Sequence, residues 1–145
     1  KENLKEILDL SNVEIISGGN YDKYKGYFIE PTVIQVNDPK YRTMCEEIFG
    51  PVVSVMPFAS EADAIAKAND TEFGLSGSIW TRDTGRALRV SRGIETGNLS
   101  VNSNSSVRYW TPFGGFKQSG LGRELGPDAV DAFTEVKNVF ISSAE

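Results

Sequence analysis

A regular alternation of strand and helix patterns in the middle of the chain limits the fold more than any other feature. Val52–Phe58 is a β-branched, apolar run typical of a buried strand, and Ser76–Trp80 and Gly97–Val101 read as further strands. A helical pattern over Glu61–Asn69 separates the first two strands, and a second helix separates the last two. Short connections of this kind imply parallel pairing with right-handed crossovers. The sequence therefore predicts an α/β fold with a parallel, open sheet and flanking helices.

Both predicted helices carry start signals. Ser60 is a typical N-cap residue, and Asp63, three positions later, occupies the acidic position of a capping box. Thr81 or Asp83 is expected to cap the second helix, which ends near Ile94. Apolar residues at helical spacing are expected to be buried: Ala62, Ile65, Ala66 and Ala68 in the first helix, Ala87 and Leu88 in the second.

The first part of the chain predicts a smaller β region. Lys1–Leu10 reads as a helix whose apolar face has no partner earlier in the sequence, so we expect a piece of a longer protein. Asn12–Gly19 predicts a strand, and Tyr27–Val36 predicts a strand or strand pair that Pro31 interrupts and places at a sheet edge. Lys40–Cys45 predicts a short turn or helix.

The last part of the chain has a different character. Asn102–Gly126 is long, polar and glycine-rich and lacks an apolar period. Such a loop inside a compact domain is usually functional, and a tolerated insertion is the alternative. Pro127 suits the first turn of a short helix over Asp128–Phe133, and Thr134–Ser142 predicts a final strand.

Composition excludes several kinds of chemistry. The chain has no histidine and one cysteine in 145 residues, which excludes histidine bases, histidine-ligated zinc, an intrachain disulfide and an all-cysteine metal site. We therefore expect no metal site and a reducing, cytoplasmic compartment. The net charge of −5 argues against partners such as nucleic acid or an anionic membrane, and no apolar run reaches membrane-span length.

Two glycine patterns do not support phosphate binding. Gly120–Gly126 nearly matches a dinucleotide fingerprint, but its last glycine comes one residue late and it follows a loop. Gly115–Gly120 has P-loop spacing, but Leu121 stands where lysine is needed.

The residues around the single cysteine are also ambiguous. Two acids follow Cys45 and disfavour its thiolate, so an inert, buried thiol is expected. Glu46 and Glu47 are adjacent, so they cannot face each other as an acid/base pair, and at most one points into a site.

Five sequence blocks carry more information together than singly. They are Glu46–Pro51, Asn69–Leu75, Pro112–Gly120, Gly122–Gly126 and Thr134–Lys137. In this order and spacing they resemble the C-terminal part of the NAD(P)-dependent aldehyde dehydrogenase superfamily. The resemblance extends from about Gly18 to Ile141.

The resemblance implies a reaction that this chain does not complete alone. Family enzymes oxidise an aldehyde to a carboxylic acid: a cysteine thiolate attacks the aldehyde, hydride passes to NAD or NADP, and water releases the acid. The family's nucleophile lies upstream in a Gly-Gln-x-Cys context that is absent here, and Cys45 does not match it. The general base and the cofactor-domain glycines are upstream too, so the isolated chain is expected to be inactive.

Seven residues receive roles from the resemblance. Glu47 accepts hydrogen bonds from the nicotinamide-ribose hydroxyls, and Phe49 packs beside the ribose and nicotinamide. Glu124 relays protons to the upstream general base; an exposed acid at a helix start is the alternative. Three of the remaining residues are expected to contact the aldehyde substrate: Phe113 as a tunnel wall, with Ser105 and Val107 from the preceding loop. Arg108 in the same loop suits a carboxylate on a semialdehyde substrate; a solvated loop arginine is the alternative.

We expect residues 1–133 to form a partial catalytic α/β domain and residues 134–145 an oligomerisation arm strand and tail. The strand would pair with a second copy of the chain, giving a homo-oligomer. Two alternatives stay open: a non-catalytic truncated module that only folds or oligomerises, and an unrelated α/β domain.

Overall fold

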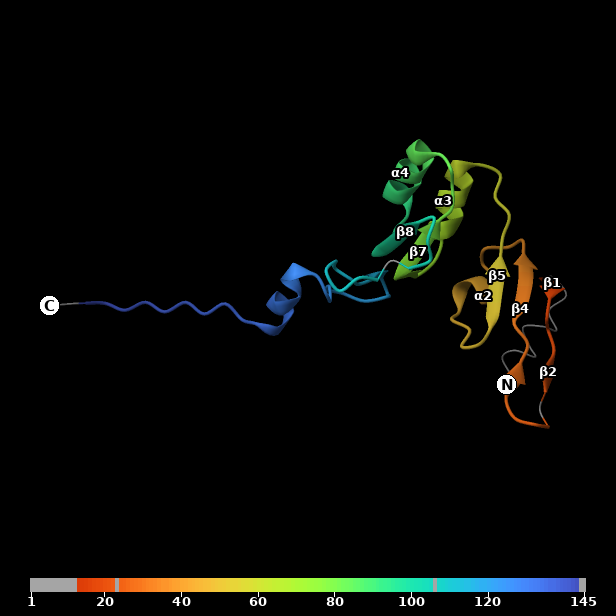
Figure 1. Ribbon diagram of the computed structural model, residues 1–145, viewed down its shortest axis with the longest axis horizontal. Helices are drawn as coiled ribbons and strands as arrows, with labels where there is room; N and C mark the ends of the chain where they lie inside the picture. Colours follow the sequence, from red (N-terminus) through yellow and green to blue (C-terminus); the bar gives the residue numbers. More distant parts are fainter. Residues whose placement is uncertain (1–12, 23, 106, 144–145) are drawn as a thin grey trace. The chain divides into compact units, whose positions relative to one another are not determined.

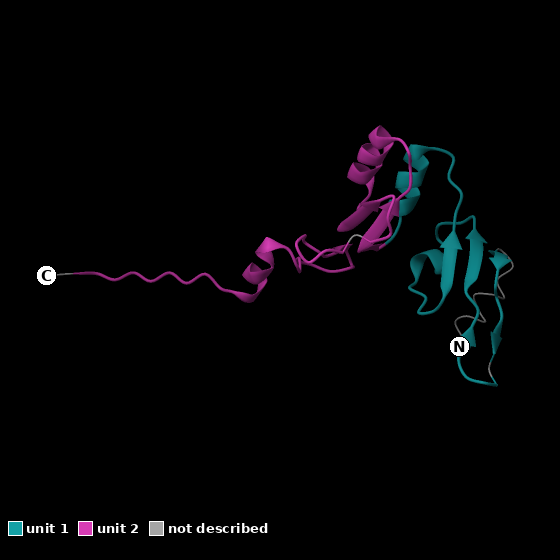
Figure 2. Ribbon diagram, viewed as in Figure 1, with its two compact units in different colours: residues 1–71 teal, residues 72–145 magenta. Residues whose placement is uncertain are grey.

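The computed structural model describes residues 13–22, 24–105 and 107–143. The chain divides into two compact units, Lys1–Thr71 (unit 1) and Glu72–Glu145 (unit 2), which are coloured separately in Figure 2. The predicted helix over Lys1–Leu10 lies outside the described residues.

Unit 1 is built on a three-stranded mixed sheet with the order β1–β4–β5 (Figure 1). β1 (Val13–Ser17) runs antiparallel to β4 (Thr32–Val36), and β4 runs parallel to β5 (Val52–Val55). A short hairpin joins β2 (Tyr21–Asp22) to β3 (Phe28–Ile29). The predicted strand after residue 12 and the predicted strand pair are confirmed.

Pro31 does not mark an edge strand, contrary to the sequence prediction. It lies between β3 and β4, so its missing N–H removes no hydrogen bond from the ladder. β4 is the central strand, and Val33 pairs with Ser17 on one side and with Val53 on the other.

The hydrophobic core of unit 1 centres on one face of β4. Ile34 and Val36 are fully buried there, and partly buried side chains pack against them, including Met44 from α2 (Arg42–Cys45): Val13, Tyr41, Met44, Ile48, Val52 and Met56. β5 is not the buried strand that the sequence predicts, since Val53 and Val55 are 54% and 38% exposed. Strand side chains alternate, so only one face of β5 meets the core.

α3 (Glu61–Asn69) has the bounds and the N-cap that the sequence predicts. Ser60 Oγ accepts a hydrogen bond from the Asp63 N–H at 3.1 Å, and the Asp63 carboxylate accepts one from the Ala59 N–H at 2.8 Å. The expected burial is wrong: no residue of α3 is buried.

Unit 2 contains the predicted parallel strand–helix–strand arrangement. It consists of β7 (Ser76–Ile79), α4 (Thr84–Gly93) and β8 (Asn98–Val101), with β7 and β8 paired in parallel. The parallel pairs β4–β5 and β7–β8 belong to separate sheets, whereas the sequence predicted one continuous parallel sheet. The α/β class is confirmed, and the sheets are open.

Asp83 is the N-cap of α4, one of the two candidates that the sequence offered. Its Oδ1 accepts a hydrogen bond from the Arg86 N–H at 3.0 Å. Ala87 is buried as expected, but Leu88 is 54% exposed, so the apolar face of α4 is only partly covered in unit 2.

The glycine-rich segment after β8 has more regular structure than its sequence indicates. β9 (Phe116–Lys117) pairs antiparallel with β6 (Phe73–Gly74), and an isolated bridge joins Phe113 to Glu124. A 3₁₀ helix, η1 (Pro127–Phe133), follows with the proline in its first turn, as predicted.

The predicted C-terminal strand is not formed within the described residues. Residues 134–143 follow η1 as an extended segment outside any strand (Figure 1). Its apolar side chains are exposed: Val136, Val139, Phe140 and Ile141. A strand needs a neighbour for its backbone N–H and C=O groups, and the described part of the chain provides none here.

No helix among the described residues is long and apolar enough to cross a membrane.

Candidate functional site

In the loop after α2, the adjacent residues Glu46 and Glu47 lie in different environments. Arg42 donates two hydrogen bonds to the Glu46 carboxylate, from Nε at 2.8 Å and from Nη2 at 2.9 Å. This interaction lowers the pKa of Glu46 below the usual glutamate value. Glu46 is therefore held by its own helix, which leaves Glu47 as the one carboxylate that can serve a site.

Glu47 and Phe49 are both exposed and lie on either side of an anchored residue. Ile48 between them packs against the core of unit 1, while Phe49 is 89% exposed. Among the described residues, no group forms a hydrogen bond with the Glu47 carboxylate. Backbone bonds hold the loop, from Gly50 N–H to Ile48 O at 2.9 Å and from Thr32 N–H to Pro51 O at 2.8 Å. The loop thus presents a carboxylate and an aromatic ring to solvent from a fixed backbone.

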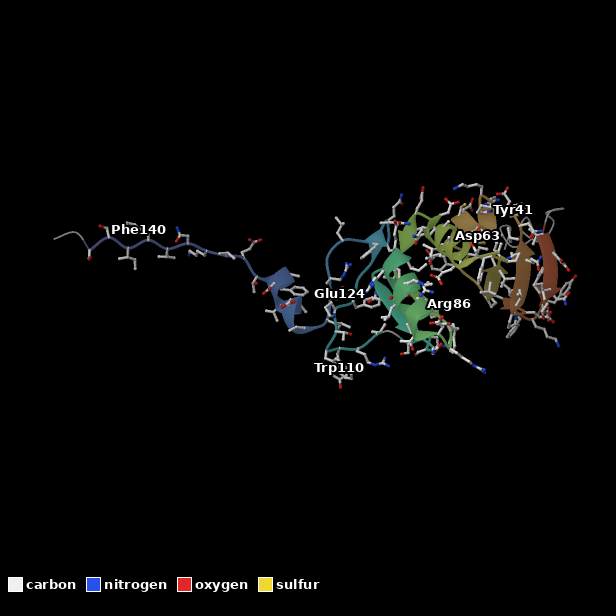
Figure 3. All side chains as sticks on the ribbon, turned by 90° about the horizontal axis from the view of Figure 1, so that it is seen from above. Tyr41, Asp63, Arg86, Trp110, Glu124 and Phe140 are labelled. Atoms are coloured by element: carbon white, nitrogen blue, oxygen red, sulfur yellow. The ribbon has the colours of Figure 1, made fainter. Side chains whose placement is uncertain are left out.

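Phe113 and Glu124, eleven residues apart in sequence, are brought together in unit 2. Each backbone N–H donates to the other residue's carbonyl oxygen at 2.7 Å. Glu124 is exposed and Phe113 is half-buried. Glu124 lies in the glycine-rich segment that also carries Trp110 (Figure 3). The bridge therefore holds the backbones of Phe113 and Glu124 side by side in unit 2.

Close backbone contacts fix the position of this bridge. A Cβ on Gly97 would lie 1.8 Å from the carbonyl oxygen of Gly114, so only glycine fits there. The buried Asn98 amide donates to Gly114 O at 2.8 Å and to Leu75 O at 2.9 Å. Sequence reasoning missed Asn98, because a polar residue in a short strand has no pattern that predicts burial.

The segment before Phe113 contains the predicted substrate contacts. Arg108 Nη1 donates to Ser105 Oγ at 3.0 Å and to Val107 O at 2.7 Å, and all three residues are exposed. Tyr109 and Trp110 follow in an edge-to-face pair with ring centroids 4.6 Å apart. The structure thus brings Ser105, Val107 and Arg108 together, while Glu47 and Phe49 belong to unit 1.

An open hollow of about 610 Å³ lies beside the glycine-rich turn in unit 2. Arg123 lines it, with its guanidinium 5.5 Å from the Phe116 ring centroid and Nη1 donating to Gly115 O at 3.0 Å. Lys117 also lines the hollow and forms an ion pair with Glu95 at 2.8 Å. These contacts close the turn upon itself and fix the backbone before Glu124.

The environment of the single cysteine differs from the prediction. Cys45 is exposed rather than buried, since it ends a four-residue helix at the surface of unit 1. Its thiol donates a weak hydrogen bond to Pro39 O at 3.5 Å. The described residues contain no group of three or more cysteine or acidic side chains arranged to hold a metal ion.

Sequence comparison gives a consistent assignment. The model of the aldehyde dehydrogenase family matches residues 3–139. An aldehyde dehydrogenase of Emericella nidulans is 42% identical over 86% of this chain and 25% of its own length. Aldehyde dehydrogenase 1A1 of Oryctolagus cuniculus is 42% identical over 100% of this chain and 30% of its own length. The chain thus spans 25–30% of the curated relatives that it matches.

Solved structures agree with the sequence comparison. The crystal structure of a Mycobacterium tuberculosis aldehyde dehydrogenase complexed with NAD⁺ is similar, with a TM-score of 0.84 and 38% identity over 92% of this chain and 29% of that one. A Staphylococcus aureus betaine aldehyde dehydrogenase in complex with NAD⁺ has a TM-score of 0.83 and 36% identity over 91% of this chain and 28% of that one.

Proposed function

The chain belongs to the aldehyde dehydrogenase family, and on that premise we propose that it is part of an enzyme oxidising an aldehyde to a carboxylic acid. The family is one of oxidoreductases. The proposal names NAD or NADP as the hydride acceptor, assigns residues 1–133 to the catalytic domain, and places the enzyme in the cytoplasm. Its nucleophilic cysteine and general base would come from outside these 145 residues.

The observation that carries the proposal is the loop containing Glu47 and Phe49. A nicotinamide ribose offers two hydroxyl donors, and a carboxylate has two oxygens that can accept them. The Glu47 carboxylate has no hydrogen-bond partner among the described residues, so both oxygens remain available. The exposed Phe49 ring, two residues away, offers a flat apolar surface for the ribose and nicotinamide. When bound, the cofactor would supply the hydride acceptor, and this loop would fix the position of its ring.

Glu124 and Phe113 receive a joint assignment. In the proposal, Glu124 passes protons to the general base, and Phe113 forms a wall of the substrate tunnel. Their paired backbone hydrogen bonds support this assignment because they hold the two backbones side by side.

Glu47 provides the first test. In the full-length enzyme, Glu47→Gln is expected to slow NAD(P)H formation in a single turnover by about tenfold, because a misplaced nicotinamide lowers the rate of hydride transfer. Alkylation of the catalytic cysteine should stay at the wild-type rate. Glu46→Gln is the matched control, since Glu46 is held by Arg42, and it should leave hydride transfer unchanged. Wild-type single-turnover rates in Glu47→Gln would contradict the assignment.

Arg108 provides a test of substrate class. Together with Ser105 and Val107 it would contact the substrate, and its guanidinium would bind a carboxylate on a semialdehyde. Arg108→Ala is expected to reduce kcat/KM for semialdehydes by about tenfold relative to uncharged aldehydes. This is the size of effect expected when one charge-assisted hydrogen bond to the substrate is lost. Steady-state kinetics on a matched pair of substrates measures this ratio, and an unchanged ratio would remove the proposed role.

We also propose that residues 134–141 pair with another copy of the chain. The extended backbone and exposed apolar side chains of this segment support the proposal, because both are stabilised when a second strand adds to them. The alternative function, a module that only oligomerises, would show the same pairing. It would differ in lacking aldehyde oxidation even when it is joined to the upstream sequence.

A further inference from the structure

We propose that Asn102 is a positioning residue that orients the substrate loop and thereby determines which aldehydes the enzyme accepts. The proposal rests on the proposed function, since it takes Ser105, Val107 and Arg108 as substrate contacts. Asn102 lies at the end of β8, where the chain leaves the parallel pair and enters that loop.

The Asn102 side chain forms two hydrogen bonds with the backbone of Thr81, just after β7, and we call this pair of bonds the clamp. Its Nδ2 donates to Thr81 O at 2.9 Å, and its Oδ1 accepts from Thr81 N–H at 2.9 Å. The Asn102 backbone N–H also donates to Ile79 O at 2.7 Å, which extends the β7–β8 ladder by one bond. Three hydrogen bonds therefore fix one residue to the end of β7.

The backbone of Asn102 turns sharply at this point. Its φ of 53° lies in the left-handed region, which asparagine tolerates better than most residues other than glycine. The side-chain bonds to Thr81 therefore hold the Asn102 backbone in a conformation that directs the chain away from β8.

Side-chain hydrogen bonds link Ser100 of β8 to the loop that follows this turn. Ser100 Oγ donates to the carbonyl oxygen of Ser103, and Ser103 Oγ accepts from the Ser105 N–H at 3.1 Å. Arg108 then donates to Ser105 Oγ at 3.0 Å. This network starts at Ser100 and not at Asn102 itself; Asn102 lies between Ser100 and Ser103, so the direction that the chain takes at Asn102 decides where Ser105 and Arg108 lie.

Packing does not hold this turn in place. Asn102 is exposed and lines an open hollow of about 570 Å³, together with residues of β8, of α4 and of the segment between β7 and α4: Trp80, Thr81, Arg82, Thr84, Ala87 and Val101. Because few side chains press on the turn, its hydrogen bonds determine its orientation.

Steady-state kinetics of the full-length enzyme tests the proposal. Asn102→Ala is expected to change the ratio of KM values for a short aliphatic and an aromatic aldehyde by about tenfold, with kcat for the better substrate nearly unchanged, because a displaced loop alters binding before chemistry. Asn102→Gly separates the two contributions, since glycine adopts φ 53° without the clamp. It should behave like Asn102→Ala; wild-type KM ratios in Asn102→Gly would overturn the proposal. Asn104→Ala, an exposed neighbour, is the control.

A second readout does not depend on activity. Trypsin cleavage after Arg108 in the 145-residue chain, followed by mass spectrometry, reports how firmly the loop is held. Both Asn102 variants should be cleaved faster than wild type and Asn104→Ala. Equal cleavage rates, or faster cleavage with unchanged KM ratios, would overturn the proposal. A wild-type enzyme that oxidises no aldehyde would refute the proposed function, while the cleavage rates would still decide whether the clamp orders the loop.

Discussion

Individual side-chain hydrogen bonds distinguish residues that are identical in sequence. Glu46 and Glu47 are identical in sequence terms, yet Arg42 binds only the first. The spacing predicts that at most one of them points into a site, because adjacent residues point in different directions, and the resemblance assigns that role to Glu47. The spacing alone could not predict which of the two Arg42 binds, since that depends on where a four-residue helix begins and ends.

Asn98 provides the prediction at this scale. Asn98→Ala is expected to lower the free energy of unfolding by about 1–3 kcal/mol, because the carbonyls of Leu75 and Gly114 each lose the donor that the buried Asn98 amide supplies. Urea unfolding of the 145-residue chain measures the change. Asn104→Ala, at an exposed position, should stay within about 0.5 kcal/mol of wild type. Similar midpoints for the two variants would show that the Asn98 amide is not structurally important.

Helices and strands were predictable where the signals are local. α3 matches the predicted bounds, and α4 is capped by Asp83, because capping depends on residues within one turn. Strand pairing was less predictable, since it depends on distant partners. β4 is central rather than an edge, and residues 134–143 form no strand among the described residues.

The cap of α4 predicts an acid-sensitive stability. The hydrogen bond from the Arg86 N–H lowers the pKa of Asp83 below that of an aspartate in the unfolded chain. The unfolded state therefore binds the proton more tightly. The stabilisation from Asp83 is fully present above the unfolded pKa and is lost as pH falls through the folded pKa.

Asp83→Asn isolates this effect, because asparagine caps a helix about as well and does not titrate in this range. The urea midpoint of wild type should fall further than that of Asp83→Asn as pH is lowered from about 7 to about 2. All other carboxylates are common to both proteins, so parallel pH curves would exclude a contribution from Asp83.

At the scale of the molecule, apolar surface remains uncovered. Phe49, Leu121 and Phe140 are each more than four-fifths exposed, although such side chains are usually buried. The sequence patterns predicted burial of α3 and β5 that the structure does not show, because a pattern does not state what covers a face. The helix α3, in which no residue is buried, and the exposed apolar tail after η1 are two examples.

The tail provides the prediction at this scale. Removal of residues 134–145 is expected to reduce the mass measured by light scattering at moderate concentration, because it removes the apolar segment that we propose pairs with a second copy. Val136→Asp combined with Phe140→Asp should have the same effect without shortening the chain, since two charges oppose burial. A monomeric wild-type chain would contradict the prediction.

The bridge between Phe113 and Glu124 has an evolutionary consequence. The residues between the two carry β9 and the hydrogen bond from Arg123 to Gly115, so a residue inserted or deleted there would disturb these contacts as well as the bridge. Descendants of this gene can therefore exchange amino acids in the intervening turn far more readily than they can change the number of codons that encode it.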